Sequence, residues 1–277
     1  MSNRADSLPQ SGGTVRSVQR AARIITTLAE HPYPMGVLEL SSRVKLSPAS
    51  VHRMLTTLIS IGWVEQNSRT AKYRLGTQML GIGSTGLITS PIVQHGRVFL
   101  TRLAALAGHH TALSTVVGLR VIHLARVPGK EGGTPDFEPG VSQPAHAMAD
   151  GKLLLAYLPK EERQYLYEVG ELVSYTPRTI VSSEVLEEQL EVIKQQGYAV
   201  DMFERFEAVR GVAVPVFDLD GSPLLAMLAL GAIDTDPDYE TWLVQQMQSL
   251  AAEMSALIAI MGDMPKASTQ FARYNLE

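Results

Sequence analysis

The stretch SPASVHRMLTTLISIGWVEQ, residues 47–66, places polar and basic side chains along the first turns of a predicted helix. Hydroxyl, imidazole and guanidinium groups donate hydrogen bonds to base edges and to phosphates. The side chains that offer such groups here are Ser47, Ser50, His52, Arg53 and Thr57. Arg53 suits either a bidentate contact with guanine or a contact with a phosphate, and the sequence leaves both open. The chemistry indicated is recognition of a nucleic acid by hydrogen bonds.

Covalent and metal chemistry is poorly represented. The chain has no cysteine, which excludes disulfides, thiolate zinc sites and a thiol nucleophile. It contains no G-x-S-x-G elbow, P-loop, G-x-G-x-x-G after a strand or H-E-x-x-H. His109 and His110 are adjacent on a predicted strand, so their side chains point to opposite faces and would not chelate one ion together. We expect no enzyme activity, no catalytic residues, no metal and no cofactor.

Charge is distributed unevenly between the two parts of the chain. Residues 1–90 hold ten Lys and Arg against four acidic residues, a net charge of +6, and the remaining fourteen basic and twenty-four acidic residues give −10. A basic N-terminal part indicates a polyanionic partner that only this part meets. The alternative is an uneven surface charge that serves solvation alone.

Three helices are predicted before residue 63. The first starts at Ser17, a candidate N-cap, and ends at His31-Pro32. The second covers Val37–Val44. The third begins at Pro48, after the N-cap Ser47, and stops at Gly62. Its predicted buried stripe is Val51, Met54 or Leu55, Leu58 and Ile61.

Two short extended runs, 63–66 and 71–76, flank a polar turn and predict a hairpin. Three helices followed by a hairpin form a winged helix-turn-helix, whose third helix lies in a major groove. Basic residues of the hairpin and of the first helix suit phosphates or a narrow minor groove; these are Arg69, Lys72, Arg16 and Arg20. Such a module can also dock a protein, an alternative that the positive charge disfavours.

The rest of the chain predicts a second domain. Residues 77–90 are apolar with three glycines and form a linker helix or a hinge, and a helix follows at 91–107. Strands are predicted at 111–117, 120–127, 198–203, 211–218 and 223–230, and helices at 148–158, 183–196 and 237–261. This mixture indicates an α/β sensor-type domain and an α+β chain overall.

The predicted organisation is a flexible arm (1–13), a winged helix-turn-helix domain (14–76), a linker helix (77–90), an effector-binding domain (91–262) and a loose tail (263–277). The chain has no signal-peptide pattern and no stretch of about 18 apolar residues, so we expect a cytoplasmic protein.

The chain resembles the isocitrate lyase regulator (IclR) family of bacterial transcription factors. The stretches that carry the resemblance are VRSVQRAARIITTLAE, SPASVHRMLTTLISIGWVEQ, KYRLG, PAHAMADGKLLLAYLP, YTPRTI and QQGYAVDMFERFEAVRGVAVPVFDLDG. The resemblance covers roughly residues 14–262. It implies a winged helix-turn-helix domain, a linker helix, an effector-binding domain of profilin-like or GAF-like fold, and dimers or tetramers on pseudo-palindromic operators near catabolic genes.

The resemblance also implies a small-molecule site around the HA-x-x-x-GK motif and the GYA-x-D segment. Its residues in this sequence are Gly140, His146, Ala147, Met148, Ala149, Asp150, Asp201, Gly211, Leu228 and Leu230. Asp201 matches a polar contact of members that bind small oxo-acids. Exposed amides at the start of the helix near Ala149 would suit an anionic or carbonyl-bearing ligand.

Other positions depart from the small-acid pattern. Gly211 stands where cysteine is usual, and Leu228 and Leu230 replace two serines, so the oxygens of a small acid would be poorly paired. Asp150 would repel a carboxylate. We expect a larger, more apolar effector, aromatic or a neutral carbonyl compound, with Asp150 or Asp201 contacting a hydroxyl or N–H group. The alternative is that the two leucines face the core and Asp150 caps its helix.

Together these features predict a ligand-responsive transcription factor whose partners are operator DNA, a small molecule and further copies of itself. A repressor is preferred over an activator. A ligand changes DNA binding only if it favours one arrangement of the protein over another. The alternative is a small-molecule sensor whose winged helix docks a protein.

Overall fold

A computed structural model of the chain describes residues 15–31, 33–130 and 138–261. The contacts divide the chain into two compact units, with the division between Ser84 and Thr85. The predicted arm (1–13) and tail (263–277) lie outside the described residues.

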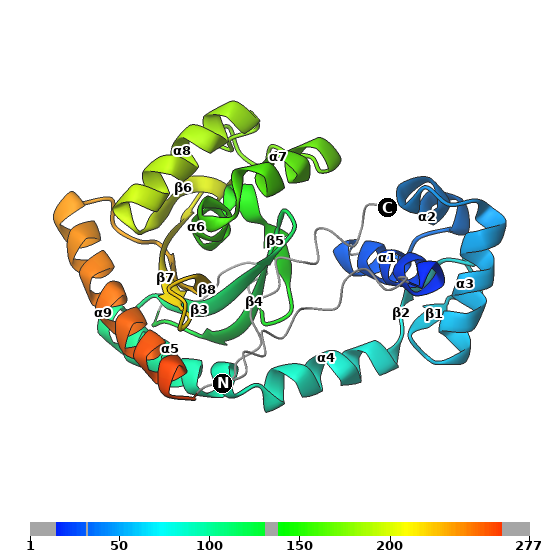
Figure 1. The fold of residues 1–277 in the computed structure, drawn as a ribbon, viewed down its shortest axis with the longest axis horizontal. Coiled ribbons are helices and arrows are strands. Elements are labelled where there is room, and N and C mark those ends of the chain that lie inside the picture. The colour runs from blue at the N-terminus through cyan, green and yellow to red at the C-terminus, as the bar shows by residue number, and fades with distance from the viewer. Residues whose placement is uncertain (1–14, 32, 131–137, 262–277) are drawn as a thin grey trace, which may run out of the picture. The chain divides into compact units, whose positions relative to one another are not determined.

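The first unit is the predicted winged helix-turn-helix (Figure 1). Its elements are α1 (Arg16–Glu30), α2 (Val37–Val44), α3 (Pro48–Ser60), β1 (Val64–Gln66) and β2 (Tyr73–Leu75). The two strands pair antiparallel, and Met35 adds an antiparallel bridge to Tyr73. One apolar cluster joins the helices to the hairpin; its buried members include Ile24, Leu40, Val51, Leu55, Val64 and Tyr73.

Helix α3 begins as predicted. The Ser47 hydroxyl accepts a hydrogen bond from the backbone N–H of Ser50 at 3.3 Å, and Pro48 occupies the first turn. Leu55, not Met54, continues the buried stripe. The prediction for Ile61 is wrong: its side chain is 48% exposed, because the helix ends at Ser60 and the chain turns away from the stripe.

The prediction that Ser17 caps the first helix is also wrong. Helix α1 begins one residue earlier, at Arg16, and its N-cap is Val15, which makes no side-chain capping bond. Serine occurs both at the N-cap and within the first turn of helices. A serine near the start of a helix therefore does not show by itself which of these two positions it occupies.

Two glycines join the hairpin to the end of α3. Gly62 has a φ of 74°, and Gly76 donates its N–H to the carbonyl of Trp63 at 2.8 Å. A Cβ on Gly76 would lie 2.3 Å from the carbonyl oxygen of Gly62. The backbones therefore approach at a distance that only glycine allows.

Helix α4 (Thr77–Thr89) follows as the predicted linker helix and contains the division between the two units. The Glu65 carboxylate accepts hydrogen bonds from the Thr77 N–H at 3.2 Å and from its hydroxyl at 2.7 Å. These bonds, together with a contact to Arg74, lower the pKa of Glu65. A carboxylate at a helix N-terminus is favourable because it opposes the helix dipole.

The second unit is built on one six-stranded antiparallel sheet, in the order β5-β4-β3-β8-β7-β6. The strands are β3 (His110–Val117), β4 (Arg120–Val127), β5 (Ser142–Pro144), β6 (Ala199–Phe206), β7 (Val209–Phe217) and β8 (Pro223–Gly231). The five predicted strands are confirmed, and β5 is a short edge strand that the pattern did not predict.

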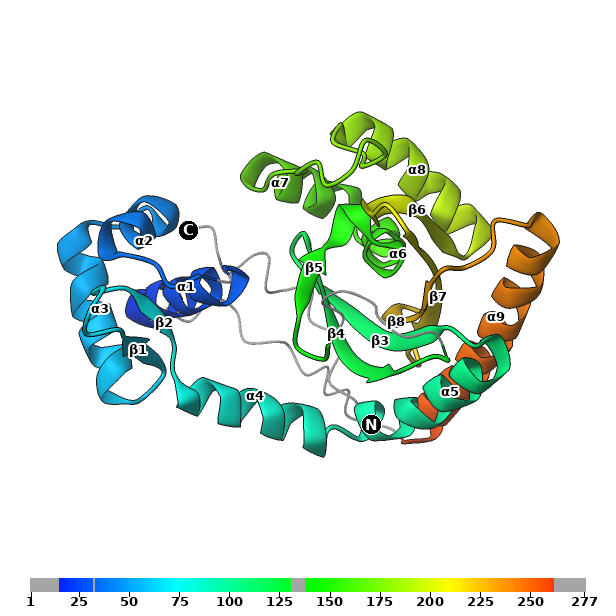
Figure 2. The ribbon, with the colours of Figure 1, turned by 180° about the vertical axis from the view of Figure 1, so that it is seen from behind.

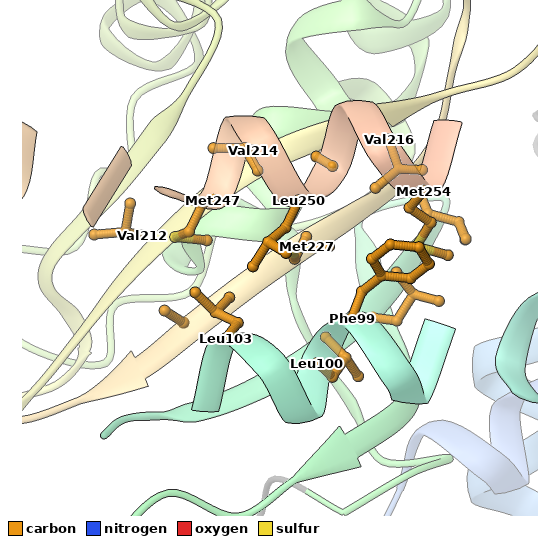
Figure 3. Packing of buried hydrophobic residues seen from close by; sticks show 14 of the residues in the cluster. Phe99, Leu100, Leu103, Val212, Val214, Val216, Met227, Met247, Leu250 and Met254 are labelled. Atoms are coloured by element: carbon orange, nitrogen blue, oxygen red, sulfur yellow. The ribbon is translucent and has the colours of Figure 1, made fainter. Parts of the chain in front are cut away.

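Helices cover both faces of this sheet (Figures 1 and 2). Helices α5 (Pro91–Ala107) and α9 (Pro237–Met261) pack on one face, where side chains from both helices and from β7 and β8 form a core (Figure 3). Helix α6 (Ala149–Tyr157) packs on the other face, with α8 (Ser183–Gln196) against it. The predicted α+β class is confirmed. Helix α7 (Lys160–Val169), which the pattern did not predict, follows α6.

No helix among the described residues is long and apolar enough to cross a membrane.

Replacing Gly76 with alanine should lower the free energy of unfolding of the winged-helix unit by about 1–3 kcal/mol, because the added methyl group overlaps the backbone of Gly62. Denaturant unfolding followed by far-UV circular dichroism measures this. Gly81→Ala, in α4, is the matched control, since a Cβ there meets nothing within 4 Å. Equal unfolding midpoints for the two variants would contradict the close-approach argument.

Candidate DNA-contact surface and ligand site

The polar side chains predicted to read DNA lie on the solvent side of α3. His52, Arg53 and Thr57 are exposed, whereas Val51, Leu55 and Leu58 are buried. The hydroxyls of Ser47 and Ser50 bond to each other at 2.9 Å, and the Thr57 hydroxyl donates to the carbonyl of Arg53. Within the described part of the chain, neither His52 nor Arg53 makes an ion pair. These two side chains are therefore available to a partner.

The wing between β1 and β2 presents two further cations. The Asn67 side chain accepts hydrogen bonds from the N–H groups of Arg69 and Thr70, at 2.9 and 3.1 Å, which fixes a tight turn. Arg69 and Lys72 are exposed and make no ion pair with any described residue. Arg74, in contrast, pairs with Glu65 at 3.0 Å. The two cations at the turn of the wing are therefore not neutralised by a described residue, whereas the cation on strand β2 is neutralised by Glu65.

The start of α1 forms a shallow basic hollow of about 210 Å³ lined by Arg16, Gln19, Arg20 and Arg23. These residues are three or four positions apart, so they share one helix face. Arg23 also donates to the carbonyl of Val44 at 3.4 Å. The sequence analysis selected Arg16 and Arg20 but missed Gln19 and Arg23, which the same helical spacing would have identified.

The predicted ligand residues lie where α6 meets the sheet. Strand register places Leu230, Gly211 and Asp201 in one cross-strand row, with Leu228 in the next row. A Cβ on Gly211 would lie 3.3 Å from the Ala149 Cβ and from Leu230 Cδ1, and 3.4 Å from Leu228 Cδ1. The structure therefore brings these four apolar positions into contact, together with Met148 in the same buried cluster. Their contact with an effector stays a prediction.

Asp150 lies in the first turn of α6, one residue inside the helix. One carboxylate oxygen accepts from the N–H of Gly151 at 3.0 Å, and the other lies 3.2 Å from Nε2 of His123 on β4. Both side chains are fully buried. The N-cap is Met148, which makes no side-chain capping bond, so the alternative that Asp150 caps its helix is wrong. Sequence reasoning missed His123 as the residue against Asp150.

Asp201 lies at an irregularity in β6, where pairing with β7 is interrupted between Asp201 and Phe206. One of its oxygens accepts from the N–H of Glu204 at 2.7 Å, and Phe203 within this bulge has a φ of 66°. Buried Lys152 donates to the Val200 carbonyl at 2.9 Å and pairs with Glu204. The bulge therefore turns a second carboxylate inward beside Asp201.

Burial raises the pKa of Asp201 to about 7, aided by the charges of Glu204 and Asp150 and opposed by the Glu204 N–H and Lys152. The second oxygen of Asp201 has no hydrogen-bond partner among the described residues. A buried carboxyl group of this kind acts as an acceptor when ionised and as a donor when protonated. It can therefore pair with either kind of ligand group.

The remaining predicted residues flank this region. His146 is buried, its Nε2 donates to the Val173 carbonyl at 3.0 Å, and burial lowers its pKa, which favours the neutral ring. Ala147 is buried beside it. Gly140 is exposed, has a φ of 85°, and donates its N–H to the carbonyl of His123. Gly140 therefore adjoins the strand that carries His123.

No set of three or more His, Asp or Glu side chains in the described residues is arranged to hold a metal ion. His109 and His110 take separate partners: Nε2 of His109 lies 2.8 Å from the Tyr239 hydroxyl, and Nδ1 of His110 accepts from the N–H of Gly129. Strand β3 begins at His110, so the premise that both histidines lie on a strand is wrong, whereas the expected hydrogen-bonding roles are confirmed.

A winged helix-turn-helix with an exposed basic face, followed by an α/β unit with buried polar groups beneath a helix, defines a ligand-binding transcription regulator. Residues 17–68 match the family model for the IclR helix-turn-helix domain, and residues 86–256 match that for the bacterial transcriptional regulator IclR C-terminal domain. The chain belongs to the IclR family of transcriptional regulators.

Three similar proteins illustrate the match. The transcriptional regulator XynR of Escherichia coli is 32% identical over 81% of this chain and 88% of its own. The structure of an IclR family regulator from Brucella abortus superposes with a TM-score of 0.75 at 20% identity, over 88% of this chain and 93% of that one. The inducer-binding domain of an Acinetobacter PobR double mutant, solved with 3-hydroxybenzoic acid, gives 0.55 at 25% identity, over 59% of this chain and 97% of that one.

The Asp201 carboxyl group should make folding stability fall as pH rises. Its pKa is about 7 in the folded protein, against an ordinary value of 3.8 for an aspartate, so the folded state binds more protons than the unfolded state between these values. Asp201→Asn lacks this titration. From pH 5 to pH 8 it should therefore gain on the order of 2–3 kcal/mol relative to the wild type.

Urea unfolding at the two pH values measures the difference, with Asp238→Asn, at an exposed position, as the control. If the Asp201 and Asp238 variants follow the same pH profile, Asp201 is not the buried titrating group.

Proposed function

We propose that the protein is a repressor that binds a pseudo-palindromic operator near catabolic genes as a dimer or a tetramer, and that an apolar or aromatic effector shifts its DNA-binding state. The observation that carries this proposal is the exposure of His52 and Arg53, which form no ion pair with a described residue, on a capped helix whose opposite side is buried. A helix of this kind presents its polar side to a major groove. The protein acts in the cytoplasm, without catalysis.

Basic residues on the wing and on α1 support an orientation in which α3 faces the DNA. The tip of the wing and the start of α1 add Arg69, Lys72, Arg16 and Arg20, all exposed or half-buried. Side chains of this type contact phosphates and position a recognition helix without reading sequence. Specificity then comes from α3 and affinity from the flanking cations.

The linker helix α4 supports a role in transmitting the effector signal. It has no buried side chain, and Gly81, Gly83 and Gly86 have no neighbouring atom within 4 Å of an added Cβ. A helix with three glycines and few packing contacts bends or unwinds at low cost. Effector binding regulates by favouring one state of this element, since equal affinity for both states would change nothing.

Two features support an apolar or aromatic effector. Leu228 and Leu230 stand at positions where hydroxyls would pair with a small acid, and both lie in an apolar cluster with Ala149. The PobR domain, which resembles the second unit, was solved with an aromatic acid. A site of this composition gains affinity from burial of an apolar ligand body.

Arg53→Ala should weaken binding to a promoter fragment from the protein's own locus by roughly 10- to 100-fold, with little change for random DNA if Arg53 contacts a base. If it contacts a phosphate, binding weakens on both DNAs and the salt slope falls by about 1. Gel-shift titrations over a salt series measure both quantities. Arg97→Ala, an exposed cation on α5, is the control and should behave as wild type. Undiminished DNA binding by the Arg53 variant removes Arg53 from the contact surface.

Small 2-oxo acids should bind poorly. We expect glyoxylate and pyruvate to bind at least about tenfold more weakly than benzoate, because Leu228, Leu230 and Gly211 leave the acid oxygens without donors. Isothermal titration calorimetry on the full-length protein provides the test. Tight binding of glyoxylate or pyruvate would rule out the apolar site while leaving the DNA-binding proposal intact.

A further inference from the structure

Ser114 is a buried hydroxyl that the fold does not use. It lies on β3 with none of its side chain exposed, and its Oγ has no hydrogen-bond partner among the described residues. A hydroxyl removed from water without a partner is unfavourable, and such groups in native proteins call for an explanation. The pairing of β3 with β4 shifts register at Leu113/Ser114, an irregularity of the kind that re-aims a side chain next to a functional site.

Strand register places Ser114 beside the His123–Asp150 pair. Ser114 is directly opposite His123, so the two side chains leave the sheet on the same face. His123 Nε2 lies 3.2 Å from Asp150 Oδ2, and this carboxylate oxygen accepts no hydrogen bond from any described group. The Ser114 hydroxyl and the Asp150 carboxylate are therefore both neighbours of His123 near the start of α6, and we call these three side chains the polar notch.

The surroundings of the polar notch are apolar. Ala226 is the cross-strand neighbour of Ser114 on β8, and Ala112, Met148 and Leu228 belong to the buried cluster on the same side of the sheet. Methyl and methylene groups supply no donor or acceptor. The unused hydrogen-bonding capacity of Ser114 and Asp150 is thus concentrated at one end of an apolar layer.

We propose that the polar notch recognises a hydroxyl group on an apolar, ring-containing effector. The ligand hydroxyl donates to Asp150 Oδ2 and accepts from the Ser114 hydroxyl, while the ring packs against the alanine and leucine side chains. This inference rests on the proposed function, since it specifies the effector chemistry of the same regulator.

Charge decides between a hydroxyl and a carboxylate at this position. Asp150 carries a negative charge when ionised, and it lies near enough to Asp201 for the two carboxyl groups to interact electrostatically. A ligand carboxylate beside Asp150 would be repelled, whereas a hydroxyl brings a proton for the carboxylate oxygen and a lone pair for Ser114. A methyl ether of the same ligand keeps the oxygen but lacks the hydroxyl proton. Comparing the ether with the hydroxyl compound therefore tests whether the ligand must donate a hydrogen bond.

The test compares two matched pairs of probes, 4-methylphenol with 4-methylanisole and 3-hydroxybenzoate with benzoate, by calorimetry on the full-length protein. In at least one pair, the wild type should bind the hydroxyl compound about tenfold more tightly or better, which corresponds to about 1.4 kcal/mol. Ser114→Ala and Asp150→Asn should reduce this preference to less than about threefold. The first deletes the donor hydroxyl, and the second places an amide NH2 group where Asp150 Oδ2 accepts, because the amide oxygen stays with the Gly151 N–H.

Ser222→Ala is the matched control, because its side chain is exposed in a turn, and it should keep the wild-type preference. Ser114→Ala should melt at the same temperature as the wild type or higher, since it deletes an unpaired buried hydroxyl. An unchanged or higher melting temperature would show that a weaker hydroxyl preference comes from the lost ligand contact and not from unfolding.

The proposal is overturned if the wild type shows no hydroxyl preference or binds neither pair, or if both variants keep the preference. Gel shifts of the ligand-free wild type on promoter DNA report separately on the proposed function. Promoter binding without hydroxyl preference would end the inference about the polar notch alone, and absence of DNA binding would end the proposed regulator.

Discussion

The second unit depends on a buried cation that holds α6 against the edge of the sheet. The Lys152 ammonium group has no solvent contact and is satisfied by the Val200 carbonyl and the Glu204 carboxylate. Removing either charge would leave the other buried and unpaired, which typically costs about 3–5 kcal/mol. Because Lys152 is two residues after Asp150, the same interaction positions the first turn of α6 over Gly211 and the leucines of β8. The packing of α6 and the position of the candidate ligand residues therefore depend on the same interaction.

Local signals predicted the winged helix well. The Ser47-Pro48 start, the 3.6-residue spacing of buried side chains and the hairpin turn are each encoded within a few residues, and the structure places α2 and α3 where these signals indicate. Errors arose where a local signal is ambiguous, as for Ser17 and Ile61. The short strand β5 lacks any periodicity of its own and forms because it pairs with β4.

The ligand region could be predicted only in part. The motif residues Asp150 and Asp201 were found, but their contacts link positions that are distant in sequence, such as His123 with Asp150 and Lys152 with Glu204. Strand register decides which side chains lie opposite each other, and it depends on the whole sheet and on irregularities such as those in the β3–β4 and β6–β7 pairings. A single sequence carries no record of such pairs, so neither the position of Ser114 opposite His123 nor the contact of His123 with Asp150 could be predicted before the strands were aligned.

The two units use polar groups in opposite ways. In the winged helix, Glu65 and Glu39 pair with Arg74 and Arg43 at the surface, and the unpaired cations stay in water, where leaving them free costs little until a polyanion arrives. Beneath α6, in contrast, unpaired acceptors are held away from water at a continuing cost in stability. A ligand that pairs them recovers this cost only in conformations that keep the groups together. That difference in energy between conformations is what a regulator requires, because only differential affinity shifts a population.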